Sequence, residues 1–381
     1  MRVLHINCNY TNSALHRIMI RHLTAHGGEH RVFIPTDGGI PFTCGENEIE
    51  AKCFRHLDRY VYFKKQAQIM AAAEKAYDAG SFDCIHAYTL FTDGNCAMRL
   101  SEKYGVPYVV AVRNTDLNGF FKRRVLLRPR GIRILENASA VFFLSEEYRR
   151  QLLEKYVPAS KREAILAKSH VIPNGVDPFW LDNPAPEKTE EELQRIKSGT
   201  LRLIFSGRII RYKNPLRTAE AVKTLNAAGY DVRLTAVGPA VEQKLLDTLL
   251  GYDNVTYIPA QPREKLLELY RQNDIFVMPS TDETFGLVYP EAMSQGLPVV
   301  YSVGEGFYGQ FPEGEAGWGA DPHDTDDVAA KILLAAVHYR EISRRCPALA
   351  RRFDWDAITR RYEAVYERVT EEYAKRTETR S

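Results

Sequence analysis

The sequence predicts an α/β protein with two doubly wound domains, and three observations support this prediction. Short runs of β-branched and aliphatic residues alternate with longer amphipathic segments, which is typical of parallel sheets with crossover helices. The 381 residues are too many for one ordinary hydrophobic core and suit two. The pattern also stops at a polar stretch rich in Pro and Glu, 182–199, and then begins again.

The first half, residues 1–178, is predicted to be one domain in which strands and helices alternate. Short apolar runs predict strands at Arg2–Asn7, Arg31–Pro35, Cys84–Ala87, Tyr108–Arg113, Val141–Leu144 and His170–Ile172. Amphipathic segments predict helices at Ser13–Ala25, Tyr62–Ala79, Asp93–Tyr104 and Glu146–Tyr156. The sequence VIPNGVD, Val171–Asp177, ends this half with a Pro-Asn-Gly turn.

The second domain is expected at residues 196–352, after an interdomain linker and a short exposed helix within 182–199. Its strands are predicted at Leu201–Ser206, Val232–Val237, Val255–Ile258, Ile275–Pro279 and Pro298–Ser302. Its helices are predicted at Pro215–Ala228, Val241–Leu250, Glu264–Gln272, Leu287–Gln295 and Thr325–Tyr339. A last helix, Phe353–Arg376, carries an apolar aromatic stripe, and the segment 353–381 is expected to pack back on the first domain.

Composition narrows the function. A formal net charge of +2 gives no support for a nucleic-acid partner. No apolar run approaches the ~18 residues of a membrane span, and the first residues are typical of a buried strand and not of a signal peptide. The six cysteines are scattered, which is typical of reduced thiols. These features predict a cytosolic enzyme or a binder of small molecules.

The segment IFVMPSTDETFGLVYPEAMSQGLPVVYS holds the densest chemistry of the chain. Glu283 lies in its predicted turn and Glu291 about one turn inside the following helix. The backbone N–H groups of Phe285, Gly286 and Leu287 precede that helix, and such a helix end favours an anion. The two carboxylates either accept hydrogen bonds from sugar hydroxyls or cap and charge the helix N-terminus. From the residues alone, both interpretations are open.

The spacing of Glu283 and Glu291 in ETFGLVYPEAMSQGLPVV resembles the donor motif of family 4 (group 1) retaining glycosyltransferases with the GT-B fold. The resemblance includes IHAYTLFTDGNCAMRL, GVPYVVAVRNTD, VIPNGVD, LIFSGRIIRYKNP, LTAVGP and FDWDAITRRYEAVY, in that order along the chain. It implies two Rossmann-like domains that face a cleft. The implied activity is metal-independent transfer of a hexosyl group, with retention, from a nucleotide-sugar.

The resemblance also implies roles for individual residues. Glu291 is expected to bind the ribose hydroxyls of the donor, and Glu283 the donor sugar. Arg208 and Lys213 match the basic pair that holds the diphosphate, where fixed cations stabilise the leaving group. The expected catalytic residues are Glu283, Arg208 and Lys213. The expected donor-binding residues are Glu291, Thr284, Phe285, Gly286, Leu287, Gly207 and Gly238.

The first domain departs from the family pattern at two places. The stretch Tyr10-Thr11-Asn12-Ser13 lacks the Gly-Gly of many members, and Arg113 stands where many members have His. The expected acceptor-binding residues are Arg113, Asn114, Asp116, Asn12 and Ser13. For Asp116, local hydrogen bonds that hold its loop are an open alternative.

Other motifs predict no cofactor and no metal. Gly304–Gly309 spells G-x-G-x-x-G, but no helix opens after it, so a dinucleotide site is not expected. Asp324-Thr325-Asp326 spells D-x-D, but an amphipathic helix follows and favours a helix cap. The histidines have no metal-ligand spacing. The nucleotide-sugar is therefore expected as a substrate, with no resident cofactor.

The segment Phe120–Arg133, FFKRRVLLRPRGIR, mixes cationic and apolar residues. It is interpreted either as a solvated helix with buried aliphatic positions or as a patch that touches an anionic membrane surface. The second interpretation suits a lipid-linked acceptor and a peripheral location on the inner face of the cell membrane.

The expected function is transfer from a nucleotide-sugar, with UDP favoured, to a glycan or lipid-linked hydroxyl in cell-surface polysaccharide biosynthesis. A catalytically silent subunit that binds nucleotide-sugars for a partner transferase is the alternative. A nucleotide-sugar epimerase and a glycogen-type phosphorylase are disfavoured, because the first lacks this Glu spacing and the second needs a far longer chain. The base, the sugar, the acceptor, the linkage and the oligomeric state do not follow from the sequence.

Overall fold

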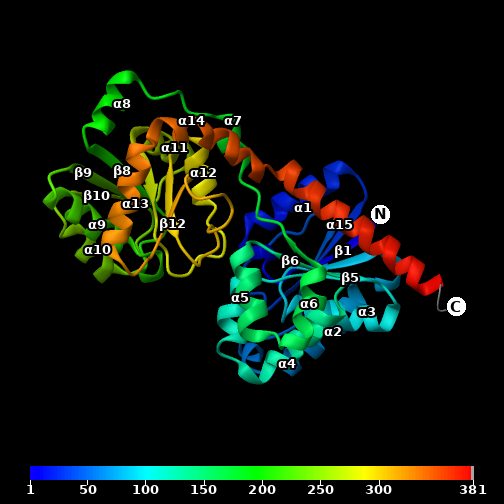
Figure 1. Cartoon of the computed structure of the whole chain (residues 1–381). Helices are drawn as coiled ribbons and strands as arrows, with labels where there is room; N and C mark the ends of the chain where they lie inside the picture. Colours follow the sequence, from blue (N-terminus) through cyan, green and yellow to red (C-terminus); the bar gives the residue numbers. More distant parts are fainter. Residues whose placement is uncertain (379–381) are drawn as a thin grey trace. The chain divides into compact units, whose positions relative to one another are not determined.

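The computed structural model describes residues 1–378 and divides into two compact units. The first contains Met1–Leu144, Tyr148–Pro173 and the final helix from Trp355, and the second contains Ser145–Glu147 and Asn174–Asp354. Each unit is a parallel β-sheet with helices on its faces (Figure 1). Within residues 1–378, no helix is long and apolar enough to cross a membrane.

The first unit is built on a seven-stranded parallel sheet with the order β3-β2-β1-β4-β5-β6-β7. The strands are β1 (Arg2–Ile6), β2 (Glu29–Thr36), β3 (Glu48–Lys52), β4 (Cys84–Ala87), β5 (Tyr108–Ala111), β6 (Ala140–Phe143) and β7 (Ser169–Val171). The helices are α1 (Ala14–His26), α2 (Tyr62–Ala76), α3 (Asp93–Tyr104), α4 (Arg128–Asn137), α5 (Glu146–Tyr156), α6 (Ala159–Ala167) and α15 (Trp355–Glu378).

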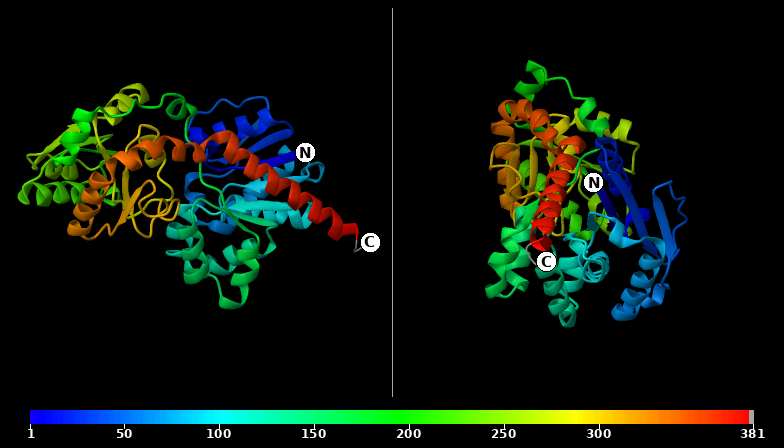
Figure 2. Two further views of the ribbon diagram at one scale, coloured as in Figure 1. Left: turned by 45° about the horizontal axis from the view of Figure 1, so that its top comes forward. Right: turned by 90° about the vertical axis from the view of Figure 1, so that its right-hand side faces the viewer.

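Both faces of this sheet are covered, so its strands are apolar on both sides. In β1, Leu4 and Ile6 join one core with α2 and α3, while Val3 joins the opposite core with α1. The last helix, α15, belongs to that second core through Trp355 and Tyr366 and runs beside α1 (Figure 2).

The second unit has a six-stranded parallel sheet with the order β10-β9-β8-β11-β12-β13. The strands are β8 (Thr200–Ser206), β9 (Asp231–Val237), β10 (Val255–Ile258), β11 (Ile275–Val277), β12 (Val299–Ser302) and β13 (Gly317–Ala320). The helices are α7 (Pro178–Asp182), α8 (Glu190–Lys197), α9 (Pro215–Ala227), α10 (Gln243–Leu250), α11 (Arg263–Gln272), α12 (Val288–Ser294), α13 (Thr325–Val337) and α14 (Tyr339–Ala350).

The prediction of α/β architecture with two parallel sheets is confirmed, but one edge strand of each sheet was missed. The edge strands β3 and β13 were not expected, because EIEAK is highly charged and GWGA is rich in glycine. Their place is set by pairing with β2 and β12 and not by an apolar run of their own. A Cβ on Gly317 would lie 1.8 Å from the Val299 carbonyl oxygen, so glycine is required there.

One predicted helix, and the helix that was one of two interpretations of Phe120–Arg133, also differ from the structure. The segment Phe120–Arg133 is not one helix, because a π-helical turn ends at Phe121, a 3-10 turn covers Val125–Leu127, and α4 begins only at Arg128. The predicted helix Thr325–Tyr339 ends at Val337, and a separate helix, α14, begins at Tyr339.

Candidate active site

The site in the second unit begins where β8 and β9 end, at the edge of the sheet where open α/β folds bind ligands. Gly207 follows β8 and Gly238 follows β9. A Cβ on Gly238, which has φ of +143°, would lie 1.9 Å from the Gly207 carbonyl oxygen. The loops after β8 and β9 therefore approach each other more closely than a side chain at position 238 would allow.

Arg208 and Lys213 lie in the loop after β8, on the two sides of Tyr212. The exposed Arg208 guanidinium donates to the Tyr212 hydroxyl. The Tyr212 carbonyl accepts from the Thr281 N–H at 2.8 Å and from the Ser280 hydroxyl at 2.9 Å. These hydrogen bonds fix the cationic loop to the loop after β11, which carries Glu283.

Asn214 fixes the same loop from its other end. It is the one non-glycine residue with positive φ, 61°, among residues 1–378, and Asn tolerates this conformation better than most residues. Its side-chain amide donates to the carbonyls of Pro279 at 2.9 Å and Pro322 at 2.8 Å. Pro215 then begins α9, so the loop ends at a rigid helix start.

Glu283 and Lys213 form an ion pair between these two loops. The side chains are only 11% and 16% exposed, respectively. A carboxylate and an ammonium group are thus held side by side at the ends of β8 and β11. Such a pair offers acceptors for hydroxyl groups next to a cation for a phosphate.

The backbone of Glu283 is also hydrogen-bonded to the loop of Glu305 and Gly306, a contact that was not predicted from the sequence. The Glu305 carboxylate accepts from the Glu283 N–H at 2.7 Å, and the Gly306 N–H donates to the Glu283 carbonyl at 2.7 Å. Burial raises the pKa of Glu305 to about 7. A Cβ on Gly306 would lie 1.9 Å from the Thr284 carbonyl oxygen. This contact explains the glycine at 306, whereas Gly304 and Gly309 have positive φ and no close neighbour.

The segment between Glu283 and α12 presents backbone and not side chains. Phe285 is buried and packs edge-on against Phe353, with 5.2 Å between ring centroids. Gly286 has φ of +80°, and a Cβ there would lie 2.4 Å from the Tyr289 ring. The N–H groups at this helix start lack helical acceptors, and Thr284 and Leu287 remain partly exposed beside them.

Glu291 is partly exposed and lies in the first turn of α12. Burial, followed by the nearby Asp177 carboxylate, raises its pKa to about 7. A carboxyl group whose pKa is shifted this strongly is typical of functional sites. At pH 8 its ionised oxygens are acceptors suited to a pair of ribose hydroxyls.

In the first unit, Asp116 is used by the protein itself. Its buried carboxylate accepts from the N–H groups of Leu90 at 3.0 Å, Phe91 at 3.2 Å and Arg113 at 2.9 Å. Burial raises its pKa to about 6. This geometry favours the structural alternative for Asp116, because it joins the loop after β4 to the loop after β5.

The other expected acceptor residues lie after β1 and β5, at the same edge of the sheet. The half-buried Arg113 donates Nε–H to the Tyr88 carbonyl at 3.2 Å, and Asn114 donates its amide to the Tyr148 hydroxyl at 3.4 Å. Asn12 is exposed at the end of a 3-10 turn, and Ser13 precedes α1 without a side-chain cap bond. The structure therefore brings Arg113 and Asn114 together on one loop and places Asn12 and Ser13 on another.

A second buried carboxylate of the first unit was missed by the sequence analysis. Asp93, at the start of α3, accepts from the Cys8 N–H at 3.1 Å and from the Thr89 hydroxyl at 2.9 Å. Burial raises its pKa to about 7. This residue holds the loop after β1, which has no Gly-Gly pair, against the start of α3.

The remaining motifs have structural roles. The Asp324 side chain accepts from the N–H groups of Asp326 and Asp327 at 2.9 and 3.2 Å, so the D-x-D is the predicted cap of α13. Among residues 1–378, no group of three or more His, Cys, Asp or Glu side chains is arranged to hold a metal ion.

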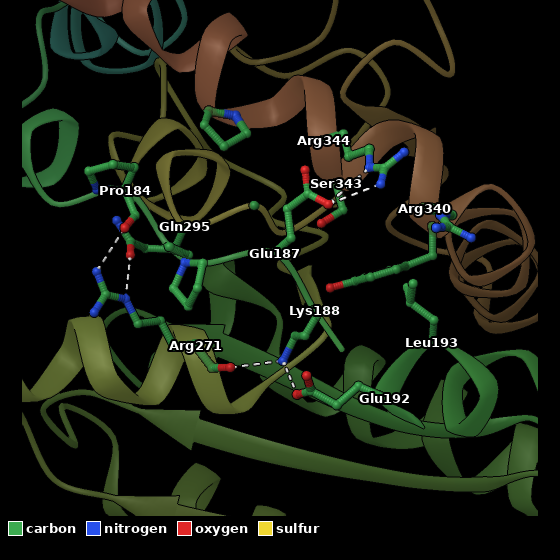
Figure 3. A pocket seen from close by; sticks show the side chains of 15 residues that line it. Pro184, Glu187, Lys188, Glu192, Leu193, Arg271, Gln295, Arg340, Ser343 and Arg344 are labelled. Carbon is green, nitrogen blue, oxygen red and sulfur yellow. Dashed lines mark hydrogen bonds and ion pairs between the residues drawn. The ribbon is translucent and has the colours of Figure 1, made fainter. Parts of the chain in front are cut away.

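Another hollow of the second unit, of about 290 Å³, lies between the 184–188 segment and α14 (Figure 3). Gln295 and Gly296 line it just before β12, so it lies at the opposite edge of the sheet from Glu283. Its cations are used within the protein. Lys188 donates to the Arg271 carbonyl at 2.8 Å, and Arg271 donates to Gln295 at 3.0 Å. This hollow is separate from the Glu283 loop.

Two sheets of this kind, with the charged loops at the carboxyl ends of the second, define the GT-B class. The sucrose-phosphate synthase of Thermosynechococcus elongatus has a TM-score of 0.75 at 19% identity and covers 98% of this chain and 100% of that one. An Anabaena HepE structure in complex with UDP and glucose has a TM-score of 0.66 at 18% identity, with 96% and 99% coverage. These likenesses show the fold.

Family models and relatives define the protein further. Residues 186–350 match the glycosyl transferases group 1 model, and residues 16–175 match the glycosyl transferase 4-like domain. The D-inositol 3-phosphate glycosyltransferase of Mycolicibacterium smegmatis is 29% identical over 320 residues, which are 80% of this chain and 71% of that protein. That of Thermomonospora curvata is 29% identical over 324 residues, with 77% and 73% coverage. The chain belongs to the family 4, group 1 glycosyltransferases, and it transfers a sugar from a nucleotide-sugar.

Proposed function

We propose that this glycosyltransferase is retaining and metal-independent and uses a UDP-sugar. It transfers a hexosyl group to a hydroxyl of a glycan or lipid-linked acceptor in cell-surface polysaccharide biosynthesis, on the cytoplasmic side of the membrane. The observation that carries the proposal is the coupling of two loops at the ends of β8 and β11. One carries Arg208 and Lys213, and the other carries Glu283, which pairs with Lys213.

The donor is proposed to lie across these loops and the start of α12. Glu291 accepts hydrogen bonds from the two ribose hydroxyls, and Glu283, with the backbone of Thr284–Leu287, holds the sugar. Because Gly207 carries no side chain, the diphosphate can approach the backbone at the end of β8, and Gly238 lets the loop after β9 pack closely against Gly207. Arg208 and Lys213 then contact the phosphate oxygens.

The chemical step follows from where charge develops. As the bond between the anomeric carbon and the diphosphate oxygen breaks, negative charge grows on the nucleoside diphosphate. Arg208 and Lys213 stabilise that charge, and their hydrogen bonds and ion pair hold them in place beforehand. The sugar becomes oxocarbenium-like, and the acceptor hydroxyl attacks the same face from which the leaving group departs, while its proton passes to the departing diphosphate oxygen.

Support for UDP comes from relatives of the fold, since HepE is described in complex with UDP and with UDP-glucose. Support for a hydroxyl acceptor comes from the relatives named D-inositol 3-phosphate glycosyltransferases. The acceptor residues proposed in this chain are Arg113, Asn114, Asn12 and Ser13, with Asp116 supporting their loop.

The proposal is tested by following UDP-sugar turnover in EDTA by proton NMR, with the wild type and Glu283→Gln. We expect the first sugar product to keep the anomeric configuration of the donor and Glu283→Gln to release about 100-fold less of it. A first product of inverted configuration, or turnover that disappears with EDTA and returns with Mg²⁺, contradicts the proposal.

The alternative, a silent subunit, predicts a different result in the same sample. A silent subunit binds the nucleotide-sugar but releases no nucleoside diphosphate, whatever acceptor is added. Binding without turnover by the folded wild type would therefore replace the proposed activity by a binding role.

A further inference from the structure

Two segments of the first unit expose apolar side chains that the active site does not explain. We call these six side chains the docking patch, and four of them are more than two-thirds exposed. The docking patch consists of Leu57, Tyr60, Val61, Phe63, Val125 and Leu126. Leu126 is 92% exposed and Tyr60 is 75% exposed. Single exposed apolar residues are ordinary, but a cluster of them marks a surface for interaction.

The two segments of the docking patch lie side by side although they are far apart in sequence. The Arg124 guanidinium donates to the Arg59 carbonyl at 3.4 Å. Phe120 lies between the segments, with 6.2 Å between its ring centroid and that of Tyr62, and it stacks on Phe91 at 4.5 Å. The two segments of the docking patch are therefore neighbours in the first unit.

The docking patch rests on a firm base. Beneath it, Tyr62 is buried and donates its hydroxyl to the Phe91 carbonyl at 2.8 Å, and Phe121 is fully buried. The Asp58 carboxylate accepts from the Arg55 N–H at 2.9 Å, which fixes the 3-10 turn that carries Leu57 and Tyr60. Because Tyr62 and Phe121 already fill the core beneath the docking patch, its exposed side chains cannot turn inward.

The charges around the docking patch are almost all positive. Residues 53–65 and 119–128 contain eight Lys and Arg side chains and a single acidic one, Asp58, which is buried. Arg59 pairs with Asp37 at 2.8 Å and Lys64 with Asp58 at 2.7 Å. Lys122 and Arg123 are exposed next to Val125 and Leu126. An apolar centre with a cationic border complements the headgroups and acyl boundary of an anionic bilayer.

The docking patch also lies at the acceptor edge of the sheet. The turn at 56–60 follows the carboxyl end of β3, and residues 120–126 follow the carboxyl end of β5. Arg113 and Asn114 follow that same end of β5. Phe120 stacks on Phe91, whose N–H donates to the same Asp116 carboxylate that accepts from the Arg113 N–H. The docking patch therefore adjoins, at Phe120, the loop proposed to bind the acceptor.

We propose that the docking patch is the surface by which the first unit sits on an anionic lipid bilayer. Its apolar side chains enter the acyl boundary, and Lys122 and Arg123 contact lipid phosphates. The bilayer then lies beside the Arg113 loop, so that the acceptor hydroxyl is one carried by a membrane lipid. This last step rests on the proposed function, whereas the contact with the bilayer does not.

The test is sedimentation of the full chain with vesicles of phosphatidylcholine alone or with about a third phosphatidylglycerol. We expect the wild type to sediment with the anionic vesicles at low salt and to be released at high salt. Lys122→Ser with Arg123→Ser should weaken the partition about 25-fold, since each cation contributes about fivefold. Phe63→Ser with Leu126→Ser should weaken it by at least tenfold.

The matched control is Val337→Ser, which removes a side chain 78% exposed on α13 of the second unit and should change nothing. Donor binding, measured by calorimetry with UDP, should be equal in all variants and shows that they are folded. A wild type that stays in solution with anionic vesicles overturns the proposal. So does a concentration-dependent dimer that Leu126→Ser abolishes, because the docking patch would then join two copies of the chain. Vesicle binding without UDP binding would leave the lipid contact standing and defeat the proposed function.

Discussion

The loops after β8 and β11 in the second unit present charged side chains to one another or to solvent, whereas the buried carboxylates Asp93 and Asp116 of the first unit accept hydrogen bonds from the backbone. Lys213 pairs with Glu283, and Arg208 is exposed. Asp116 and Asp93 instead bind N–H groups of neighbouring loops. The two sheets share an architecture, so the difference lies in what their loops present.

The comparison teaches that an acidic residue at a strand end is not by itself a binding residue. A carboxylate with two or three backbone N–H donors has few lone pairs left for a ligand. The donor loops use a different kind of support. Their framework is made by Tyr212, Asn214 and Glu305, which leaves the Glu291 carboxylate and the remaining N–H groups of Arg208 for a ligand.

The largest expected effect is that of Arg208→Ala. We expect kcat/KM to fall about 10² to 10³-fold, because a fixed cation no longer stabilises the leaving diphosphate. Arg211→Ala is the matched control, since Arg211 is an exposed cation of the same loop and does not belong to the proposed donor site. Steady-state release of UDP measures both. Equal losses in the two variants would mean that loop charge in general, and not Arg208, is responsible.

The second largest effect is expected for Gly306→Ala, which should disrupt the hydrogen bonds that hold the Glu283 loop. The added Cβ would lie 1.9 Å from the Thr284 carbonyl and 2.6 Å from the Phe285 nitrogen, so the Glu283 loop must move. We expect a loss of about 1 to 3 kcal/mol in stability and weaker donor binding. Gly309→Ala has no heavy atom within 4 Å and tests the cost of its positive φ alone. Unfolding in urea and calorimetry with UDP measure the two quantities; donor binding unchanged in Gly306→Ala contradicts the support by Glu305 and Gly306.

Asp116→Asn tests whether Asp116 of the first unit has a structural role and does not bind a ligand. An amide keeps one acceptor oxygen where the carboxylate serves three N–H groups, so we expect stability to fall by about 1 to 3 kcal/mol. The affinity for UDP should not change, because the donor loops belong to the second unit. A stable variant with a raised KM for the acceptor alone would show that Asp116 binds the acceptor directly.

The smallest effect concerns pH. The pKa of Glu291 is raised to about 7, so its carboxylate form becomes populated as the pH rises through neutrality. Since the ribose hydroxyls need that form as acceptor, donor affinity should increase about tenfold from pH 6 to pH 8. Glu291→Gln should bind weakly with no such dependence. A wild-type affinity that is flat with pH, at unchanged protein stability, contradicts the role of Glu291.

The same groups affect folding in the opposite direction. The pKa values of Asp93, Glu291 and Glu305, each raised to about 7 from ordinary values near 4, mean that the native state holds more protons than the unfolded state between about pH 4 and 7. The free energy of unfolding should therefore fall as the pH rises through this window. Urea unfolding at several pH values separates this effect from the rise in donor affinity.

The sequence predicted what depends on local spacing. Two parallel sheets, the cap at Asp324 and the family followed from short patterns, and Glu283 and Glu291 are eight positions apart on one turn and helix. The support of Glu283 by Glu305 joins residues 22 apart, and the contact between Arg59 and Arg124 joins residues 65 apart. Such pairings arise from the packing of loops, which one sequence without relatives does not encode in any local pattern.

The central claim is that the carboxyl-end loops of the second unit hold the nucleotide-sugar. Calorimetric titration with UDP-, GDP- and ADP-sugars, in EDTA, tests it most directly on the wild type, Glu291→Ala, Arg208→Ala and the control Arg211→Ala. We predict that one donor binds the wild type and Arg211→Ala, and that its binding is lost in the other two variants. Binding of no nucleotide-sugar by the folded wild type, or equal binding by Glu291→Ala and Arg208→Ala, would contradict the claim.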